Sequence, residues 1–230
     1  MTKKTGGPRI PDQEQETVDP LQRFLARIKA FVLARQKPLT IAAAIVCAAA
    51  IAGAGVYYFL ERARESASAM LVQTTRQYEQ LGENPDEEEL EKIKQNYEKL
   101  IDEYGYTGPA KMALLQYAGL CYSTGDYRRA LKLYEQAYEA FEKSFEFRCV
   151  ALNGMAHANS AIGEHKKALS LFEQVAGDQN QALRDQALFN MGLLYSRTGD
   201  REKSLGAYEQ LVEDFPDSIF AEPAKDKLSG

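Results

Sequence analysis

The segment DQALFNMGLLYSRTGDREKSLGAYEQLVEDFP, residues 185–216, contains the pattern that most clearly predicts the fold. Apolar residues recur in it at helical spacing on both sides of Gly199-Asp200, which predicts one helix over 182–197 and a second over 201–214. Glycine provides the left-handed backbone that ends a helix, and an acidic residue after it favours the start of the next helix. The segment therefore predicts a hairpin of two helices joined by a tight turn.

The same pattern recurs at a nearly fixed spacing along the C-terminal part of the chain. Pairs of an aromatic residue and a glutamate lie 37, 38 and 36 residues apart, and Gly-acid pairs keep the same step. The aromatic residues are Tyr97, Tyr134, Phe172 and Tyr208, and the glycines are Gly125, Gly163 and Gly199. This period predicts an array of stacked helical hairpins, because one hairpin cannot bury its own apolar face.

Apolar periodicity extends the array in both directions. A degenerate first unit pairs a helix over 62–82 with one over 85–104, whose start is marked by Asn84 and Pro85. A short final helix over 219–228 covers the last unit. The helices predicted between these ends span 109–123, 127–143, 147–161 and 165–176. The sequence therefore predicts an all-α solenoid.

These repeats resemble the tetratricopeptide repeat (TPR) family over about residues 85–217. Cys121 and Asn159 depart from the family pattern, because the first two full units have them where a tyrosine is usual. The matching residues are Ala118, Gly125, Ala130 and Tyr134; Ala156, Gly163, Ala168 and Phe172; and Gly192, Tyr195, Gly199, Tyr208 and Pro216. The resemblance implies an α-solenoid of helical hairpins whose first helices line a concave, protein-binding groove.

Residues 38–60, PLTIAAAIVCAAAIAGAGVYYFL, carry no charge and are long enough to cross a bilayer as one helix. A buried helix of a soluble domain is the alternative, but charged residues stand at both edges of the stretch. A cleaved signal peptide has a shorter charged region before it, and the small-residue site Ala67-Ser68-Ala69 lies behind four charged residues. We therefore expect a transmembrane helix that persists in the mature protein.

The charges of the chain are unevenly distributed. Residues 1–37 carry eight Lys/Arg and four Asp/Glu, residues 38–60 carry none, and residues 81–230 carry 17 against 26. The excess of cations before the span places the N-terminus in the cytoplasm by the positive-inside rule. We expect a single-pass protein of the bacterial inner membrane with a periplasmic TPR domain. A net charge of −5 predicts no nucleic-acid partner.

The segments around the span have separate expected roles. Residues 20–37 predict a basic amphipathic juxtamembrane helix on the inner leaflet, so that residues 21–60 contact lipid; docking of a cytosolic protein is the alternative. Residues 1–19 have too few aliphatic side chains to fold and predict a disordered cytoplasmic tail. Residues 61–84 predict a stem helix that packs on the array. The TPR domain, residues 85–230, holds about three full repeats, the degenerate unit and the capping helix.

Residues that could carry chemistry do not converge. His157 and His165 lie on different helices with no carboxylate or cysteine cluster beside them, and we expect His165 to pack and His157 to face the groove. Cys121 and Cys149 occupy positions offset by about 15 Å along adjacent first helices, which predicts two buried thiols and no disulfide. No phosphate-binding glycine loop or nucleophile motif occurs. We expect no enzyme activity, cofactor, metal or small-molecule substrate.

The concave positions of the family predict a groove of apolar and amide side chains. Such a surface suits an extended or helical peptide segment. The alternative is that the stem helix or a neighbouring subunit covers part of it. The groove lacks the lysine-rich pattern of TPR domains that clamp a chaperone's C-terminal carboxylates. The predicted groove residues are Leu115, Gln116, Tyr122, Asn153, His157, Phe189, Asn190, Leu193 and Arg197.

Two functions fit this organisation. A basic helix, a single span and a short repeat array are similar to the ancillary subunit of the bacterial Sec translocon. That resemblance implies a scaffold that assists translocation or hands exported proteins to chaperones, with translocon subunits and periplasmic chaperones as partners. The alternative is an envelope assembly or cell-division scaffold, because residues 208–228 resemble the repeats of the Tol-Pal-associated coordinator and of outer-membrane assembly lipoproteins.

Overall fold

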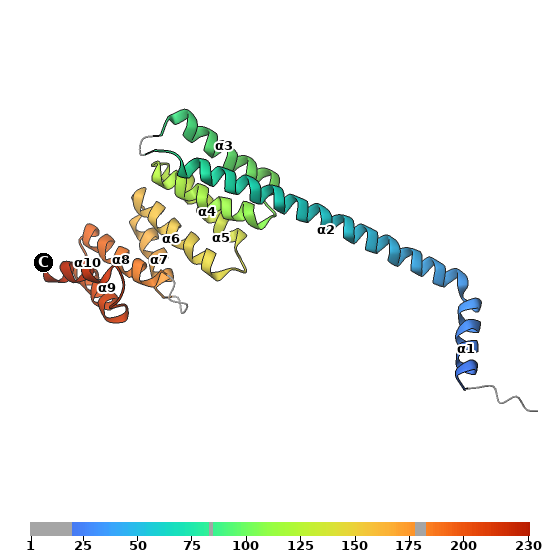
Figure 1. The fold of residues 1–230 in the computed structure, drawn as a ribbon. Coiled ribbons are helices and arrows are strands. Elements are labelled where there is room, and N and C mark those ends of the chain that lie inside the picture. Colours follow the sequence, from blue (N-terminus) through green and yellow to red (C-terminus); the bar gives the residue numbers. More distant parts are fainter. Residues whose placement is uncertain (1–19, 83–84, 178–182) are drawn as a thin grey trace, which may run out of the picture. The chain divides into compact units, whose positions relative to one another are not determined.

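The computed structural model describes residues 20–82, 85–177 and 183–230, and every regular element in these ranges is a helix. The predicted disordered tail, residues 1–19, lies outside them. The chain divides into two units that meet between Tyr58 and Phe59, inside α2. The helices are α1 (Pro20–Ala34), α2 (Gln36–Glu79), α3 (Glu87–Tyr104), α4 (Gly108–Ser123), α5 (Tyr127–Ala140), α6 (Phe145–Ala161), α7 (His165–Ala176), α8 (Arg184–Thr198), α9 (Arg201–Asp214) and α10 (Ala221–Ser229) (Figure 1).

The predicted span and stem form one helix, α2, which ends at Glu79 rather than at residue 84. No glycine or proline follows Gly55 in this helix, so nothing in the backbone interrupts it. Residues 36–60 are exposed along their whole length, whereas Ala63, Ala67 and Thr74 are buried. The change from exposed to buried therefore falls close to the predicted end of the apolar stretch.

Several predicted helix boundaries differ from the structure by a few residues; α5, for example, ends at Ala140 rather than at residue 143. Helix α3 begins at Glu87, because Asp86 caps it by accepting a hydrogen bond from the Glu88 N–H at 3.4 Å. Pro85 therefore precedes the cap, and Asn84 lies outside the described residues. Helix α1 ends at Ala34, where the Arg35 N–H bonds to the carbonyls of Phe31 and Val32, so the predicted helix over 20–37 stops three residues early.

Three turns of the same geometry reverse the chain between the helices of each full hairpin. Their glycines have φ between +83° and +86°, a conformation that residues with a Cβ rarely adopt. In each turn the acidic residue after the glycine donates its backbone N–H to a carbonyl five residues earlier, as in a Schellman motif. These bonds are Asp126 to Cys121 at 2.8 Å, Glu164 to Asn159 at 2.9 Å and Asp200 to Tyr195 at 2.9 Å.

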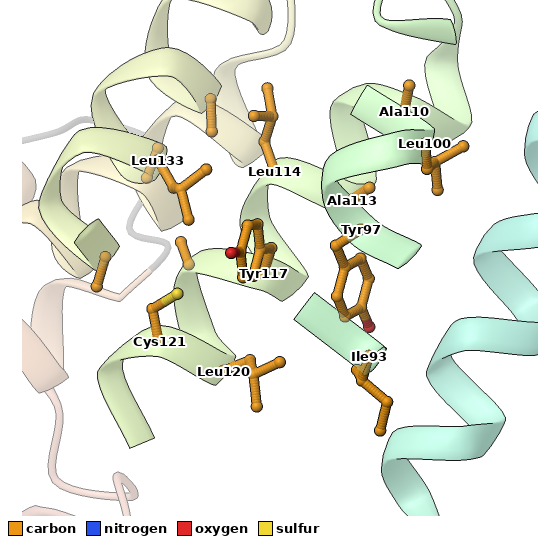
Figure 2. Close-up of a cluster of buried hydrophobic side chains, with 14 of the residues drawn as sticks. Ile93, Tyr97, Leu100, Ala110, Ala113, Leu114, Tyr117, Leu120, Cys121 and Leu133 are labelled. Carbon is orange, nitrogen blue, oxygen red and sulfur yellow. The ribbon is translucent and has the colours of Figure 1, made fainter. Parts of the chain in front are cut away.

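The buried side chains of the array form two clusters. The first joins α2 to the start of α6, and the stacked rings of Tyr97 and Tyr117 lie at its centre with centroids 5.6 Å apart (Figure 2). The second joins α6 to α10. Helix α6 belongs to both, since Ala151 lies in the first cluster and Ala156 in the second. Neither cluster could form from one hairpin, which agrees with the stacking predicted from the period.

The second half of α2 takes the place of the first helix of the degenerate unit. Met70, Leu71 and Tyr78 pack on the first cluster. Polar side chains add three contacts: Thr75 Oγ1 donates to Gln116 Oε1 at 2.7 Å, Asn96 Nδ2 donates to Gln77 Oε1 at 3.1 Å, and the hydroxyls of Tyr78 and Ser123 lie 3.4 Å apart. The second half of α2 therefore packs on the array through both apolar and polar contacts.

Aromatic rings of two second helices lie directly on glycines of first helices. A Cβ atom at Gly154 would lie 2.4 Å from the Tyr134 ring, and one at Gly192 would lie 2.5 Å from the Tyr208 ring. Both distances are too short for any side chain. The other small positions of the repeats, Ala118, Ala130, Ala156 and Ala168, are fully buried. Ser204 stands where an alanine is usual, and its hydroxyl donates to the Gly192 carbonyl at 2.8 Å.

Gly154→Ala should destabilise the array by about 1–3 kcal/mol, because the added methyl group forces the Tyr134 ring out of place. Gly206→Ala is the matched control: Gly206 is exposed within α9 with open space at its Cβ, so alanine there should stabilise by about 0.5–1 kcal/mol. Thermal unfolding followed by circular dichroism in mild detergent measures both. Equal effects of the two substitutions would contradict the packing argument.

The acidic residues that precede the three second helices differ in whether their side chains cap the helix. Asp126 and Asp200 each accept a hydrogen bond from a backbone N–H three residues later at 3.2 Å, whereas Glu164 makes no side-chain cap. All three residues have similar backbone angles. Because the glutamate side chain is longer by one methylene group, Glu164 does not form this hydrogen bond, and α7 has no side-chain cap.

Glu164→Asp should restore the missing bond and stabilise the array by about 0.5–1 kcal/mol, while Asp126→Ala should destabilise it by about 1 kcal/mol. Urea unfolding of the two variants beside the wild type measures both changes. A Glu164→Asp variant no more stable than the wild type would show that the cap geometry is not limiting.

Candidate functional site

The predicted groove residues connect the first helices of successive hairpins. The rings of Tyr122 on α4 and His157 on α6 lie edge to face with centroids 6.2 Å apart. His157 Nε2 lies 3.5 Å from Asn190 Nδ2 on α8, and Asn153 Nδ2 donates to Gln186 Oε1 at 3.4 Å. These contacts place the predicted residues of the second and third full units side by side on one face of the array.

Five of the nine predicted residues line one pocket of about 230 Å³. They are Tyr122, His157, Asn190, Leu193 and Arg197. Ser160 and Ala161 of α6, Phe172 of α7 and Leu194 of α8 complete its walls. The pocket therefore combines aromatic and aliphatic surfaces with an amide, an imidazole and a guanidinium, and its residues come from all three full units.

The other four predicted residues are engaged by neighbouring side chains. Leu115 packs on the first cluster, and Gln116 Oε1 accepts hydrogen bonds from Thr75 and Tyr97. Asn153 is buried, and the Phe189 ring stacks on Phe220 with centroids 5.3 Å apart. The stem helix thus covers part of the face, as the alternative interpretation held, and the open part lies in the middle of the array.

Burial and charge differ sharply between two of the pocket residues. The imidazole of His157 packs edge to face on Phe172 at 5.1 Å, and burial lowers its pKa. Arg197 is exposed, and none of the ion pairs within the described residues includes it. By contrast, Arg129 pairs with Glu98, and Arg184 lies 3.9 Å from Asp214. The pocket therefore combines an imidazole whose pKa is lowered by burial with an exposed guanidinium that has no ion-pair partner in the part of the chain that the structure describes.

The repeat pattern does not place all of the remaining wall residues in the groove: it assigns Phe172 to repeat packing and does not single out Leu194, although both follow the helical periodicity of their segments. It also missed a network on α3, α4 and α5, in which the Tyr117 hydroxyl donates to Glu98 at 2.7 Å and Arg129 binds the same carboxylate. Glu98 and Glu173 both belong to the aromatic-Glu pairs of the repeat, and Glu173 likewise accepts a hydrogen bond from the Tyr195 hydroxyl at 3.1 Å. The glutamate of these pairs is therefore the sequence signal for such a contact.

Other hollows and groups offer less convergent chemistry. A wider hollow of about 820 Å³ runs along α2 from Glu61 to Gln80, but all of its walls come from that single helix. Cys121 and Cys149 are buried, and burial raises the pKa of the Cys121 thiol to about 11. Within the described ranges, no group of three or more His, Cys, Asp or Glu is placed to hold a metal ion.

The second unit is therefore an α-solenoid of helical hairpins with a pocket on the face of its first helices. The sequence model of the tetratricopeptide repeat-like domain family matches residues 31–228, so the chain belongs to that family. The TPR resemblance and the all-helical solenoid are confirmed, and the fold is consistent with a protein-interaction scaffold. A comparison with curated proteins gave no match.

Solved structures show the same fold. A tetratricopeptide repeat protein from Parabacteroides merdae is 16% identical with a TM-score of 0.57; the match covers 72% of this chain and 59% of that protein, less than two thirds of its length. A protein from Podosopora anserina, whose TPR-like repeats are nearly identical to one another, is 16% identical to this chain with a TM-score of 0.53. The match covers 70% of this chain and 82% of that protein. At such identities the likeness concerns the fold alone.

Acidification should destabilise the array through His157. Its pKa is lower in the folded chain than the unfolded value of about 6.5, so the unfolded chain binds the proton more readily and stability falls as the pH drops below that value. Urea unfolding at pH 7.5 and pH 5.5 measures the loss. His157→Gln should reduce it, whereas His165→Gln leaves the His157 contribution in place. An unchanged loss in His157→Gln would assign the pH dependence to other groups.

Proposed function

We propose that this chain is a membrane-anchored, non-enzymatic scaffold of the bacterial envelope. Residues 38–60 cross the inner membrane, the N-terminus is cytoplasmic and the TPR array is periplasmic. The array assists protein translocation beside the Sec translocon or hands exported proteins to chaperones. The observation that carries the scaffold role is the open pocket in the middle of the array, since all of its walls come from the repeats themselves.

Three observations support the anchor. Helix α2 is the one described helix that is long and apolar enough to cross a membrane, and none of its most apolar window is buried. Tyr57 and Tyr58 at the end of the apolar stretch are 70% and 69% exposed, as side chains of an interfacial aromatic belt are. The family match begins at residue 31, so the apolar stretch belongs to the region that the family shares.

The charge distribution supports the orientation. The five cations between Arg23 and Lys37 precede the span without an acid among them, whereas residues 61–80 after it balance three Lys/Arg against three Asp/Glu. Cytoplasmic cations and a periplasmic array follow from the same rule. The exposed apolar face of α1, which includes Phe24 and Phe31 at 60% and 56% exposure, fits the headgroup boundary of the inner leaflet.

A second candidate is a scaffold for envelope assembly or cell division. The observation that favours it is the C-terminal end of the array, residues 208–228, whose sequence is similar to the repeats of such proteins. In the structure this segment forms the end of α9 and the cap α10, which packs on the last hairpin. It differs from the first candidate in its partners and not in its architecture.

Site-specific photocrosslinking in native membranes tests the proposal. A benzophenone amino acid at Leu193, which is 36% exposed in the pocket, should yield adducts with translocon subunits, exported chains or periplasmic chaperones. The matched control is Tyr106, a 54% exposed aromatic residue before α4 that does not line the pocket. Division or outer-membrane assembly proteins among the Leu193 adducts would support the second candidate, and identical adducts from both positions would contradict a role of the pocket.

The orientation is checked on the same strains. Alkaline phosphatase fused after Gly230 is active only in the periplasm, so an active fusion is expected. A fusion that is inactive, while its counterpart fused before residue 20 is active, would reverse the proposed topology.

A further inference from the structure

The pocket has the size and walls of a site for one large apolar side chain. Its volume is about 230 Å³, and an engineered apolar cavity of about 150 Å³ is already enough to hold benzene. Tyr122, His157 and Phe172 present ring surfaces to it, and Leu193 and Leu194 add aliphatic ones. A phenyl ring or a branched aliphatic side chain therefore fits, with room for only one such group.

The edge of the same pocket carries a guanidinium with no carboxylate partner among the described residues. This is Arg197, which lies on α8 one helical turn after Leu193. Residues 81–230 contain 26 acidic side chains, yet none of the described ones pairs with it. A guanidinium binds a carboxylate through two parallel hydrogen bonds, so the charge at this edge complements an anionic group.

A third group can bind the backbone of a ligand. Asn190 Nδ2 donates to the Gln186 carbonyl at 2.8 Å, which fixes the amide and leaves its oxygen able to accept from a ligand N–H. Along α8 the amide of Asn190, the aliphatic side chain of Leu193 and the guanidinium of Arg197 thus follow one another on successive turns. This order matches an extended peptide better than a compact folded surface.

We propose that this pocket binds an extended segment of a partner protein in which a large apolar side chain stands next to a carboxylate, with the side chain in the cavity and the carboxylate on Arg197. The inference rests on the proposed scaffold function and names the chemistry of its ligand. The carboxylate has two possible sources, an acidic side chain or a free C-terminus. The pocket recognises the chemistry that both share.

Titration of the full chain in lipid nanodiscs with synthetic peptides, followed by calorimetry, tests the proposal. The probes are acetyl-Gly-Ser-Gly-Phe as the free acid, the same peptide as its C-terminal amide, its Phe-to-Ala form, and acetyl-Gly-Phe-Asp-Gly amide. The free acid should bind at least roughly 10-fold tighter than its amide, because a charge-assisted hydrogen bond is lost. The Phe-to-Ala form should be weaker by a similar factor. Equal binding of acid and amide overturns the proposal.

The fourth peptide separates the two sources of the carboxylate. Binding as tight as that of the free acid identifies an acidic side chain as sufficient, and binding as weak as that of the amide identifies the C-terminus as the required group. Both results keep the apolar side chain and the carboxylate together. If none of the four peptides binds the folded chain, the proposal is wrong.

Variants assign the preference to named side chains. Arg197→Gln should bring the acid and amide peptides to equal affinity, while Leu193→Ala should weaken both by the same factor. The matched control is Arg128→Gln, which removes an exposed arginine from α5, outside the pocket. Circular dichroism confirms that each variant is folded. An Arg197→Gln variant that still prefers the acid overturns the proposal.

The two proposals fail in different ways. Crosslinks from Leu193 to envelope proteins, combined with equal binding of acid and amide, leave the scaffold function and remove the carboxylate preference. A carboxylate preference without such crosslinks leaves the binding chemistry and removes the proposed partners. If a second copy fills the pocket, sedimentation shows a dimer and the peptides do not compete; that result overturns the inference.

Discussion

The array depends on rings that lie against positions without a side chain. Tyr134 on Gly154 and Tyr208 on Gly192 bring a second helix closer to a first helix than any Cβ would allow. Interiors of this density transmit small displacements, so each contact fixes the rotation of one helix relative to the next. The left-handed glycines at the hairpin turns set where the chain reverses, but the ring contacts set how closely the helices pack. The pocket is formed between helices held in this way.

The period made most of the fold predictable. Repeated Gly-acid pairs identify the turns because the left-handed backbone requires glycine, and the aromatic-Glu pairs identify the second helices. The sequence does not fix the start of a helix where two residues can each serve as its N-cap. Asp86 caps α3, although Asn84 is also a residue type suited to that role. Gly154 could not be recognised as a ring contact, because it stands at a position where the other units carry different residues. The join of span and stem within one helix follows from the absence of a breaking residue.

The candidate site was predictable by position and less so by exposure. Helical periodicity correctly brought together Tyr122, His157 and Asn190, since their helices are neighbours in the stack. It could not show that Phe189 is covered by Phe220, because Phe220 precedes α10 outside the repeat and its packing depends on contacts distant in the sequence. Nor could it show that Arg197 has no ion-pair partner among the described residues, because pairing depends on the reach of side chains from other helices. The repeat therefore predicts which face of the array a residue lies on, whereas its exposure and its side-chain partners depend on the whole fold.

The pocket lies where the two clusters of buried side chains meet, which links ligand binding to the stability of the array. Helix α6 is the only helix that contributes buried residues to both clusters described, and the pocket takes Tyr122 from one side and Phe172 from the other. Regions with separate cores can open as separate cooperative units. A peptide segment bound in the pocket would contact residues of both clusters and would therefore bridge the junction between them at α6. The proposed ligand would therefore oppose the separation of the two clusters at α6, and the stability of this junction would depend on whether the pocket is filled.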